Sequence, residues 1–337
     1  MLDNAPRVAP VATIYDVAAS AGVSHQTVSR YLRGFEGIRP ATRRRVELAL
    51  EELDYRPNSA ARALRRAKSN RIGVIAHDLE EAGPARIIKG AFNEARREGY
   101  FLDIILVDVD DPASLESGLA IAFEQRVDGI LALAQSDEVV KRLMTDLPDS
   151  VVAAEIETDS LNAHANERSG WLAADHLLEL GHPAIGYVSG PSRWDSARSR
   201  QRGFEMRLAA EGTRPAWVKE GDWSARSGYE VWNALSDSER DVTAIAAAND
   251  SSAIGLVAAL TASGRRVPAD VSVIGTDDVT EAQFQIPALT TIRMDHEGQG
   301  AVSVASLISA LEGTAGASPA QFLPPALIVR DSTVAYG

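Results

Sequence analysis

The chain has 337 residues, no cysteine and a formal net charge of −13, and 45% of its residues are hydrophobic while 24% are charged. This composition is typical of a globular protein, and the length predicts two or three domains. Without cysteine the chain forms no disulfide, thiolate zinc site or cysteine nucleophile, which fits a reducing compartment. No secretory signal or membrane-spanning apolar run stands out, so we expect a cytoplasmic protein.

Residues 13–32 have the pattern of a helix-turn-helix. Thr13 and Asp16 can form a capping box at the start of a first helix, and Gly22 gives the backbone freedom that a tight turn needs. Ser24 can then cap a second helix. The polar and cationic side chains that this second helix leaves outward are His25, Gln26, Ser29 and Arg30. A helix of this kind can read base edges in a major groove.

Charge is distributed unevenly along the chain. Residues 1–71 hold 13 Lys and Arg against 7 Asp and Glu, a net charge of +6, and the remaining residues carry −19. A basic N-terminal end attracts phosphates, whereas an acidic body is repelled by them. Because a helix-Gly-helix pattern often arises by chance, this charge asymmetry is what favours DNA binding by the N-terminal end.

Two further helices are predicted before residue 71. The first spans 41–53 and has three outward arginines, Arg43–Arg45, which are either a solvated face or phosphate contacts. The neighbouring motif favours phosphate contacts. Beyond it, Asn58 can cap a short helix at 59–66, in which Leu64 is the one large apolar residue. A helix of two turns is marginal in water, so we expect it to fold only when a partner holds it.

From residue 71 onward, apolar strands alternate with amphipathic helices. Strands are predicted at 71–76, 101–107, 129–134 and 150–155, and after them at 184–190, 216–221, 243–250 and 271–278. The helices between them are predicted near 84–98, 113–126 and 137–146, and then near 169–180, 196–211, 224–236 and 251–263. This order predicts two doubly wound parallel-sheet halves with a ligand cleft at the carboxyl ends of their strands. The polar residues at those ends are Glu155, Asn249, Asp250, Asp277 and Asp278.

These motifs resemble the LacI/GalR family of transcription regulators from about Thr13 to Thr333. TIYDVAASAGVSHQTVSR is similar to the family headpiece, and RPNSAARALR is similar to its hinge helix. The segments that resemble its sugar-binding core, in family order, are DHLLELGH, SARSRQRGF, AANDSSAIG, VPADVSVIGTDD and PALTTIR. EGDWSARSG and the VSHQTVSR helix point within the family toward lactose-repressor-like members.

The resemblance implies a small all-α helix-turn-helix headpiece joined to an α/β core with a periplasmic-binding-protein-like fold. The headpiece would span 1–57, the hinge helix and linker 58–70, and the effector-binding core 71–337. The core's N-terminal half would take about 71–164 and 295–324, and its C-terminal half about 165–293 and 325–337. Arg39 replaces the Ser or Thr that usually caps the third helix, so this helix should start less firmly.

The resemblance also implies a repressor that binds a palindromic operator as a homodimer and is released by a sugar, with a galactoside as one candidate. It makes Gln26 and Arg30 base-reading residues, His25 the variable position that tunes operator choice, and Leu64 a wedge in the minor groove. The expected DNA-binding residues are Thr13, Ser24, His25, Gln26, Thr27, Ser29, Arg30, Asn58, Ala61 and Leu64.

In the core, Arg200, Asn249 and Asp277 resemble the family's hydroxyl-binding trio, and Trp223 resembles the aromatic platform under a sugar ring. Arg donates from a fork, Asp accepts from neighbouring hydroxyls, and Trp covers the apolar face of a pyranose. Met294 and His296 stand where close relatives often carry an amide and an aromatic residue. The expected effector-binding residues are Glu155, Ser196, Arg200, Trp223, Asn249, Asp277, Met294 and His296, whereas Asp250 and Asp278 are expected to cap or brace.

Other functions have less support in the sequence. No nucleophile is paired with a base, no Gly-rich turn could cradle a phosphate, and the six histidines lack metal-ligand spacing, so we expect no enzyme, cofactor or metal site. A solute-binding transport protein would share the core but would need export and no reading helix. Within the regulator class, the alternative is a corepressor-dependent member that binds a nucleobase or another non-sugar ligand.

Overall fold

The computed structural model describes residues 12–32, 34–55, 68–77, 79–108, 111–133, 151–155, 160–314 and 321–337. The chain divides into two compact units, Met1–Ser69 and Asn70–Gly337. The predicted hinge helix, with Asn58, Ala61 and Leu64, lies outside the described residues, as does the helix expected near 137–146. None of the described helices combines the length and the apolar character needed to cross a membrane.

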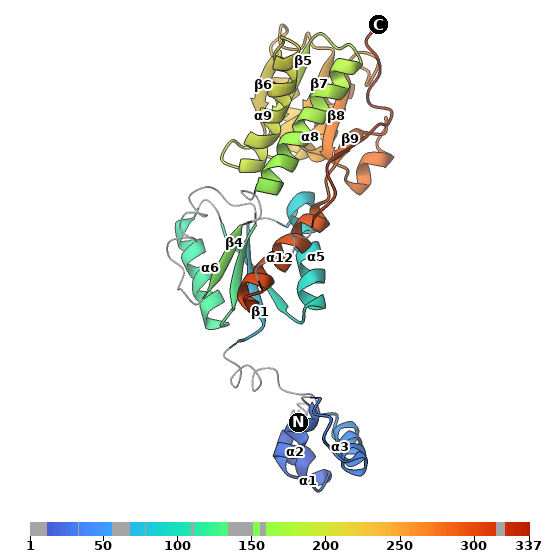
Figure 1. Cartoon of the computed structure of the whole chain (residues 1–337). Coiled ribbons are helices and arrows are strands. Elements are labelled where there is room, and N and C mark those ends of the chain that lie inside the picture. The colour runs from blue at the N-terminus through green and yellow to red at the C-terminus, as the bar shows by residue number, and fades with distance from the viewer. Residues whose placement is uncertain are drawn as a thin grey trace, which may run out of the picture. The chain divides into compact units, whose positions relative to one another are not determined.

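The described part of the N-terminal unit is a bundle of three short helices (Figure 1). They are α1 (Ile14–Ser20), α2 (His25–Leu32) and α3 (Pro40–Glu52). Val17, Val28 and Val46, one from each helix, are fully buried in a common apolar cluster. Burying one face of each helix against the other two stabilises elements that would be marginal alone. The predicted helix-turn-helix headpiece is confirmed.

The ends of these helices follow their local sequence. Thr13 and Asp16 form the predicted capping box, in which the Asp16 carboxylate accepts from the Thr13 amide at 2.7 Å and the Thr13 hydroxyl accepts from the Asp16 amide at 3.3 Å. Gly22 has a φ of 58°, the left-handed conformation that the turn requires. Arg39 precedes α3 without a side-chain cap. The third helix therefore begins without the hydrogen bond that Ser or Thr would supply.

The N-terminal half of the core contains a four-stranded parallel sheet in the order β2-β1-β3-β4. Its strands are β1 (Arg71–Ala76), β2 (Phe101–Leu106), β3 (Gly129–Ala132) and β4 (Val152–Glu155). The helices of this half are α5 (Ala82–Arg97), α6 (Pro112–Glu124) and α12 (His296–Glu312). α5 and α12 cover one face of the sheet, and α6 covers the other (Figure 1).

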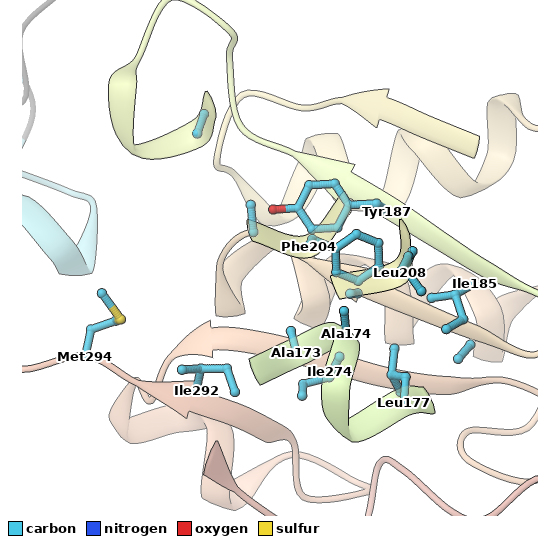
Figure 2. Packing of buried hydrophobic residues seen from close by; sticks show 14 of the residues in the cluster. Ala173, Ala174, Leu177, Ile185, Tyr187, Phe204, Leu208, Ile274, Ile292 and Met294 are labelled. Carbon is cyan, nitrogen blue, oxygen red and sulfur yellow. The ribbon is translucent and has the colours of Figure 1, made fainter. Parts of the chain in front are cut away.

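The C-terminal half contains a six-stranded sheet in the order β10-β9-β8-β7-β5-β6. Its strands are β5 (Ile185–Ser189), β6 (Trp217–Glu220), β7 (Ala244–Ala247), β8 (Ser272–Asp277), β9 (Thr290–Arg293) and β10 (Ala326–Ile328). The helices are α8 (Ser160–Glu179), α9 (Asp195–Ala210), α10 (Ala225–Ala234) and α11 (Asp250–Ala262), with a 3-10 helix, η1 (Thr280–Phe284). Leu177 of α8 and Phe204 of α9 pack on one face (Figure 2), and α10 and α11 cover the other.

The predicted architecture of two parallel, helix-covered halves is confirmed. The structure adds two strands that the sequence did not predict, β9 and β10, of four and three residues. β9 has one apolar residue, Ile292, and β10 is only three residues long, so neither carries a recognisable apolar run. β10 pairs antiparallel with β9 at the edge of the sheet. The chain passes from the N-terminal half into the C-terminal half after β4. It returns to the N-terminal half with α12 and enters the C-terminal half again with β10.

α5 and α12 contact each other backbone to backbone. A Cβ atom on Gly90 of α5 would lie 1.9 Å from the carbonyl oxygen of Glu297, and one on Gly300 of α12 would lie 1.9 Å from that of Ile87. Neither position has room for any larger residue. This contact places the first two turns of α12 against the second and third turns of α5.

Gly300→Ala should destabilise the core by about 3 kcal/mol, because the new methyl group meets a carbonyl oxygen of the opposite helix. Gly83→Ala is the matched control: its Cβ would have no neighbour closer than 3.6 Å, so it should be neutral or slightly stabilising. Urea denaturation measures both. Equal stability of the two variants would contradict the close helix contact.

Candidate functional site

A cavity lies between the two halves of the core, at the carboxyl ends of their strands, with about 60 Å³ of space for water-sized molecules. It can hold a few waters as it stands. Of the predicted effector-binding residues, those that line it are Ser196, Arg200, Trp223, Asn249, Asp277 and His296. Lining residues that the sequence analysis did not select include His77, Glu81, Asn166, Trp194, Ser251 and Gln299.

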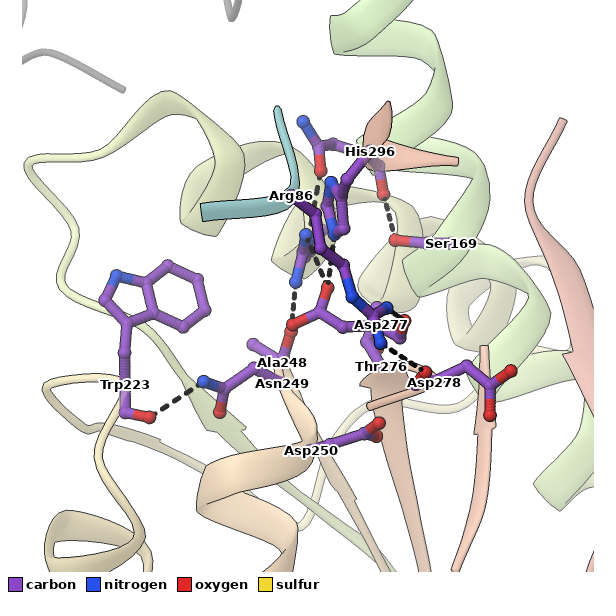
Figure 3. Close-up of polar contacts among 12 residues, drawn as sticks. Arg86, Ser169, Trp223, Ala248, Asn249, Asp250, Thr276, Asp277, Asp278 and His296 are labelled. Atoms are coloured by element: carbon purple, nitrogen blue, oxygen red, sulfur yellow. Dashed lines mark hydrogen bonds and ion pairs between the residues drawn. The ribbon is translucent and has the colours of Figure 1, made fainter. Parts of the chain in front are cut away.

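Arg200 of α9 and Asp277 at the end of β8 form a buried ion pair in this cavity. Arg200 Nη2 lies 3.1 Å from Asp277 Oδ1, and the two side chains are 7% and 8% exposed. The same guanidinium donates from Nε to Asn166 Oδ1 at 3.0 Å and from Nη1 to the Ala248 carbonyl at 2.5 Å. His296 Nε2 lies 3.1 Å from Asp277 Oδ1 (Figure 3). The arginine is therefore fixed in one orientation by three partners.

Asp277 is ionised at neutral pH. Burial opposes its ionisation, but the charge of Arg200 and the hydrogen bond from His296 outweigh burial and hold the pKa of Asp277 below its usual value. Both contacts fall on the Oδ1 atom. A buried carboxylate of this kind is a strong acceptor for hydroxyl or N–H groups of a ligand.

Trp223 is held over the cavity by its backbone. It is 8% exposed with a φ of 74°, and its carbonyl accepts from Asn249 Nδ2 at 2.7 Å. Asn249 Oδ1 meanwhile caps α11 by accepting from the Ser252 amide at 3.0 Å. The amide group of Asn249 thus holds the Trp223 loop, and it retains one N–H and one lone pair for a ligand.

A second tryptophan completes the apolar lining. Trp194 is 3% exposed and stacks on His77 with ring centroids 4.3 Å apart. His77 follows β1 in the N-terminal half, whereas Trp194 precedes α9 in the C-terminal half, so this stack joins the two halves. Both residues come shortly after the carboxyl end of a strand, the signal that could have selected them from the sequence.

Two of the predicted effector-binding residues do not join this group. Met294 does not line the cavity: it is 4% exposed and belongs to the apolar cluster that contains Ile274 and Ile292 (Figure 2). An apolar thioether packs into the interior where an amide would seek polar partners, and the expected contact of Met294 with the effector stays a prediction. Glu155 ends β4, and its side chain lies outside what the structure describes.

The outward face of α2 carries the predicted base-reading side chains. His25, Gln26 and Arg30 are exposed, and Thr27 and Ser29 are half-buried. Ser24 accepts from the Thr27 amide at 3.3 Å and so caps this helix as predicted. An exposed helix that begins with polar side chains can enter a major groove without rearrangement.

Known proteins match both units of the chain. A family model described as bacterial regulatory proteins, lacI family, matches residues 13–58, and one for a periplasmic binding protein-like domain matches residues 174–333. The lactose operon repressor of Escherichia coli strain K12 is 34% identical over 328 residues, which cover 96% of this chain and 91% of that protein. The chain belongs to the LacI family of bacterial regulators.

A second relative is a repressor with a different name from the lactose operon repressor. The HTH-type transcriptional repressor PurR of Haemophilus influenzae is also 34% identical, over 334 residues that cover 96% of this LacI-family chain and 98% of that protein. The sequence-based family assignment is thereby confirmed. The chain is a DNA-binding transcriptional repressor, and, as expected, it is not an enzyme, because its relatives are repressors.

Solved structures of relatives share the fold along nearly the whole chain. The lac repressor dimer bound to operator and the anti-inducer ONPF has a TM-score of 0.82 at 33% identity and covers 96% of this chain and 99% of that one. The Lac repressor bound to ONPG in the repressed state has a TM-score of 0.86 at 32% identity, with the same coverage. Both matches include the headpiece and the core of the LacI-family chain.

Near the cavity of this LacI-family core, Asp250 braces the end of β8. Its Oδ2 accepts from the Val279 amide at 2.8 Å, and its Oδ1 accepts from Thr291 Oγ1 at 2.5 Å. Burial, together with the nearby charge of Asp277, raises the pKa of Asp250 to about 8. Asp278 also braces, through ion pairs to Arg293 and Arg330. The predicted bracing role of these two acids agrees with these contacts.

The raised pKa of Asp250 should make stability fall as pH rises. Between pH 3.8, the ordinary pKa of this group, and about pH 8, the folded chain holds a proton on Asp250 that the unfolded chain has lost. The free energy of unfolding should therefore fall by about 1 kcal/mol for each pH unit in this range. Asp250→Asn cannot ionise, and its amide can still accept from the Val279 amide. Urea denaturation from pH ~4 to ~8 should therefore show the wild type losing stability relative to the variant. A difference independent of pH would show that Asp250 is charged in the folded chain.

Proposed function

We propose that this repressor binds a palindromic operator as a homodimer and is released when a sugar binds in the core cavity. The observation that carries the sugar assignment is the buried Arg200–Asp277 pair beside two tryptophans, Trp194 and Trp223. A pyranose presents hydroxyl groups at its edge and apolar C–H groups on its faces, which match a charged pair and indole rings. A galactoside is the first candidate, because one relative is the lactose operon repressor.

A non-sugar corepressor, such as a nucleobase, is the second candidate. A PurR repressor is as similar to this chain as the lactose operon repressor, at 34% identity. Indole rings also stack on a planar base, and Asp277 could accept from a ring N–H group. The two candidates have opposite effects on operator affinity, because a sugar inducer weakens operator binding whereas a corepressor strengthens it. Titration with sugars and with nucleobases, while operator binding is followed, separates them.

The proposed homodimer is supported by the edge of the N-terminal sheet. β2 is an outer strand, and Phe101, Ile104 and Leu106 on it are 58%, 46% and 56% exposed. An edge strand with exposed apolar side chains is typical of a surface that a partner covers. One structural relative is a lac repressor dimer bound to operator. A twofold symmetric dimer with one reading helix in each subunit would require a palindromic site.

The proposed DNA contacts come from α2, with arginines of α3 beside them. Gln26 and Arg30 would read base edges, with His25 tuning the choice of operator, and Arg44 is exposed and can reach a phosphate. Leu64 remains proposed as the minor-groove wedge from the sequence alone.

The allosteric proposal predicts that sugar and operator oppose each other. A coupling of roughly 1 to 3 kcal/mol would make operator binding about 5- to 150-fold weaker with sugar, and by linkage sugar binding equally weaker on the operator. Isothermal titration with and without operator DNA measures this ratio. Equal sugar affinities in the two titrations would contradict the allosteric proposal.

Asp277→Asn should leave operator affinity unchanged and weaken sugar binding about 10- to 100-fold, because a charged acceptor is replaced by a neutral one and the buried Arg200 loses its ion pair. Asp278→Asn is the matched control, since that carboxylate pairs with arginines away from the cavity lining. Operator release by sugar is the measurement. Normal release of Asp277→Asn would remove this residue from the effector site.

Arg30→Ala should cost about 1 to 3 kcal/mol on the cognate operator and relax the preference at one base pair per half-site. Arg44→Ala should instead weaken binding evenly across DNA sequences. It should also reduce by about one the slope of the logarithm of the binding constant against the logarithm of the salt concentration. Competition binding with a set of mutated operators distinguishes the two patterns. An even loss for Arg30→Ala would make Arg30 a phosphate contact.

A further inference from the structure

We infer that Arg86 is a positioning residue that ties the effector-binding Asp277 to the N-terminal half of the core. Arg86 lies on α5, whereas Asp277 and Asp278 end β8 in the other half. Arg86 Nη1 donates to the Asp277 carbonyl at 3.0 Å, and Nη2 donates to the Asp278 carbonyl at 3.1 Å (Figure 3). One guanidinium therefore holds two successive carbonyls across the cleft. The inference rests on the proposed role of Asp277 in binding the effector.

The backbone that Arg86 holds is strained. Asp277 has a φ of 111° and Asp278 a φ of 51°, both in a region that residues with a Cβ seldom occupy. Such conformations persist only where the surroundings hold them. The amide side of this turn is held within the C-terminal half, where the Asp278 amide donates to Thr291 Oγ1 at 3.3 Å. The carbonyl side receives its two hydrogen bonds from the opposite half, so the full turn depends on both halves.

The N-terminal half also contacts the Asp277 side chain. His296 is the first residue of α12, and its Nε2 lies 3.1 Å from Asp277 Oδ1. Because α5 and α12 are locked together at Gly90 and Gly300, Arg86 and His296 should move as one body. A change in the relation of the halves would thus disturb Asp277 at its carbonyl and at its carboxylate. This gives effector affinity a direct dependence on conformation, which allosteric coupling requires.

α5 offers a matched control at Lys89, less than one helical turn after Arg86. Lys89 Nζ pairs with Glu297 Oε1 of α12 at 2.7 Å. Both partners belong to the N-terminal half, and the pair is exposed. Lys89→Ala therefore removes a cation and an ion pair from the same helix without removing a contact to β8.

Hydrogen exchange tests the positioning role without any ligand. In the full-length chain, Arg86→Ala should speed amide exchange in the segment 277–279 by about tenfold, because two hydrogen bonds from a charged donor are lost. Arg86→Lys should restore part of the protection, since an ammonium group can still donate to one carbonyl. Lys89→Ala should exchange like the wild type. Unchanged exchange in Arg86→Ala would overturn the inference.

Sugar binding tests the link to the effector, with D-galactose and methyl β-D-galactopyranoside as probes. Arg86→Ala should bind the probe about tenfold more weakly, and the effect of operator DNA on probe affinity should shrink toward onefold. Lys89→Ala should keep both the affinity and the operator effect. A full operator effect in Arg86→Ala would overturn the coupling role. If neither probe binds the wild type, the galactoside proposal fails, while hydrogen exchange still decides whether Arg86 holds the turn.

Discussion

Two buried charges, Arg200 and Asp277, are the interaction on which the rest of the candidate site depends. Moving an ion pair out of water is costly, and in the interior the pair is tolerated only where further hydrogen bonds satisfy both groups. Here Asn166 and the Ala248 carbonyl satisfy the arginine, and His296 contributes to the carboxylate. The ion pair and the two partners of the arginine lie within the C-terminal half, and His296 is the contact that the N-terminal half adds to the carboxylate. A ligand would then meet donors and acceptors that are already oriented.

The same network keeps two neighbouring acids in different protonation states. Asp277 has a lowered pKa, because the charge of Arg200 and the bond from His296 outweigh its burial, whereas burial raises the pKa of Asp250 to about 8. The neutral acid can brace the charged one without strong repulsion. Gly275 makes this arrangement possible, since a Cβ there would lie 2.2 Å from Asp250 Oδ1. One carboxyl group is thus free to serve a ligand, while the other holds the backbone beneath it.

The sequence predicted the elements whose signals are local. Helical spacing, the Thr13 capping box and Gly22 defined the headpiece, and long apolar strands defined the two halves of the core. The polar residues at strand ends led to Asn249 and Asp277, because parallel strands bring their carboxyl ends to one edge. These positions follow from rules that act over a few residues.

Rules that act over a few residues did not predict the direction of side chains or the contacts between the two halves of the core. Met294 stands two residues before His296, yet one is buried in the apolar cluster and the other lines the cavity. Motif position alone does not distinguish them. Arg86 similarly reads as a solvated cation on an amphipathic helix, and its two carbonyl partners come from far along the chain. Contacts of this kind depend on how the halves meet, which no local pattern encodes.

The number of polar contacts across the cleft is consistent with a switch. At Asp277 and Asp278 the described contacts from the N-terminal half are the two hydrogen bonds of Arg86 and the one of His296. Each such bond contributes roughly 1 to 3 kcal/mol when a charged group takes part. Allosteric coupling in proteins is typically about 1 to 3 kcal/mol, so the gain or loss of one or two of these bonds supplies the required difference. A large apolar interface between the halves would exceed what a small ligand can shift, whereas a few exchangeable hydrogen bonds stay within its reach.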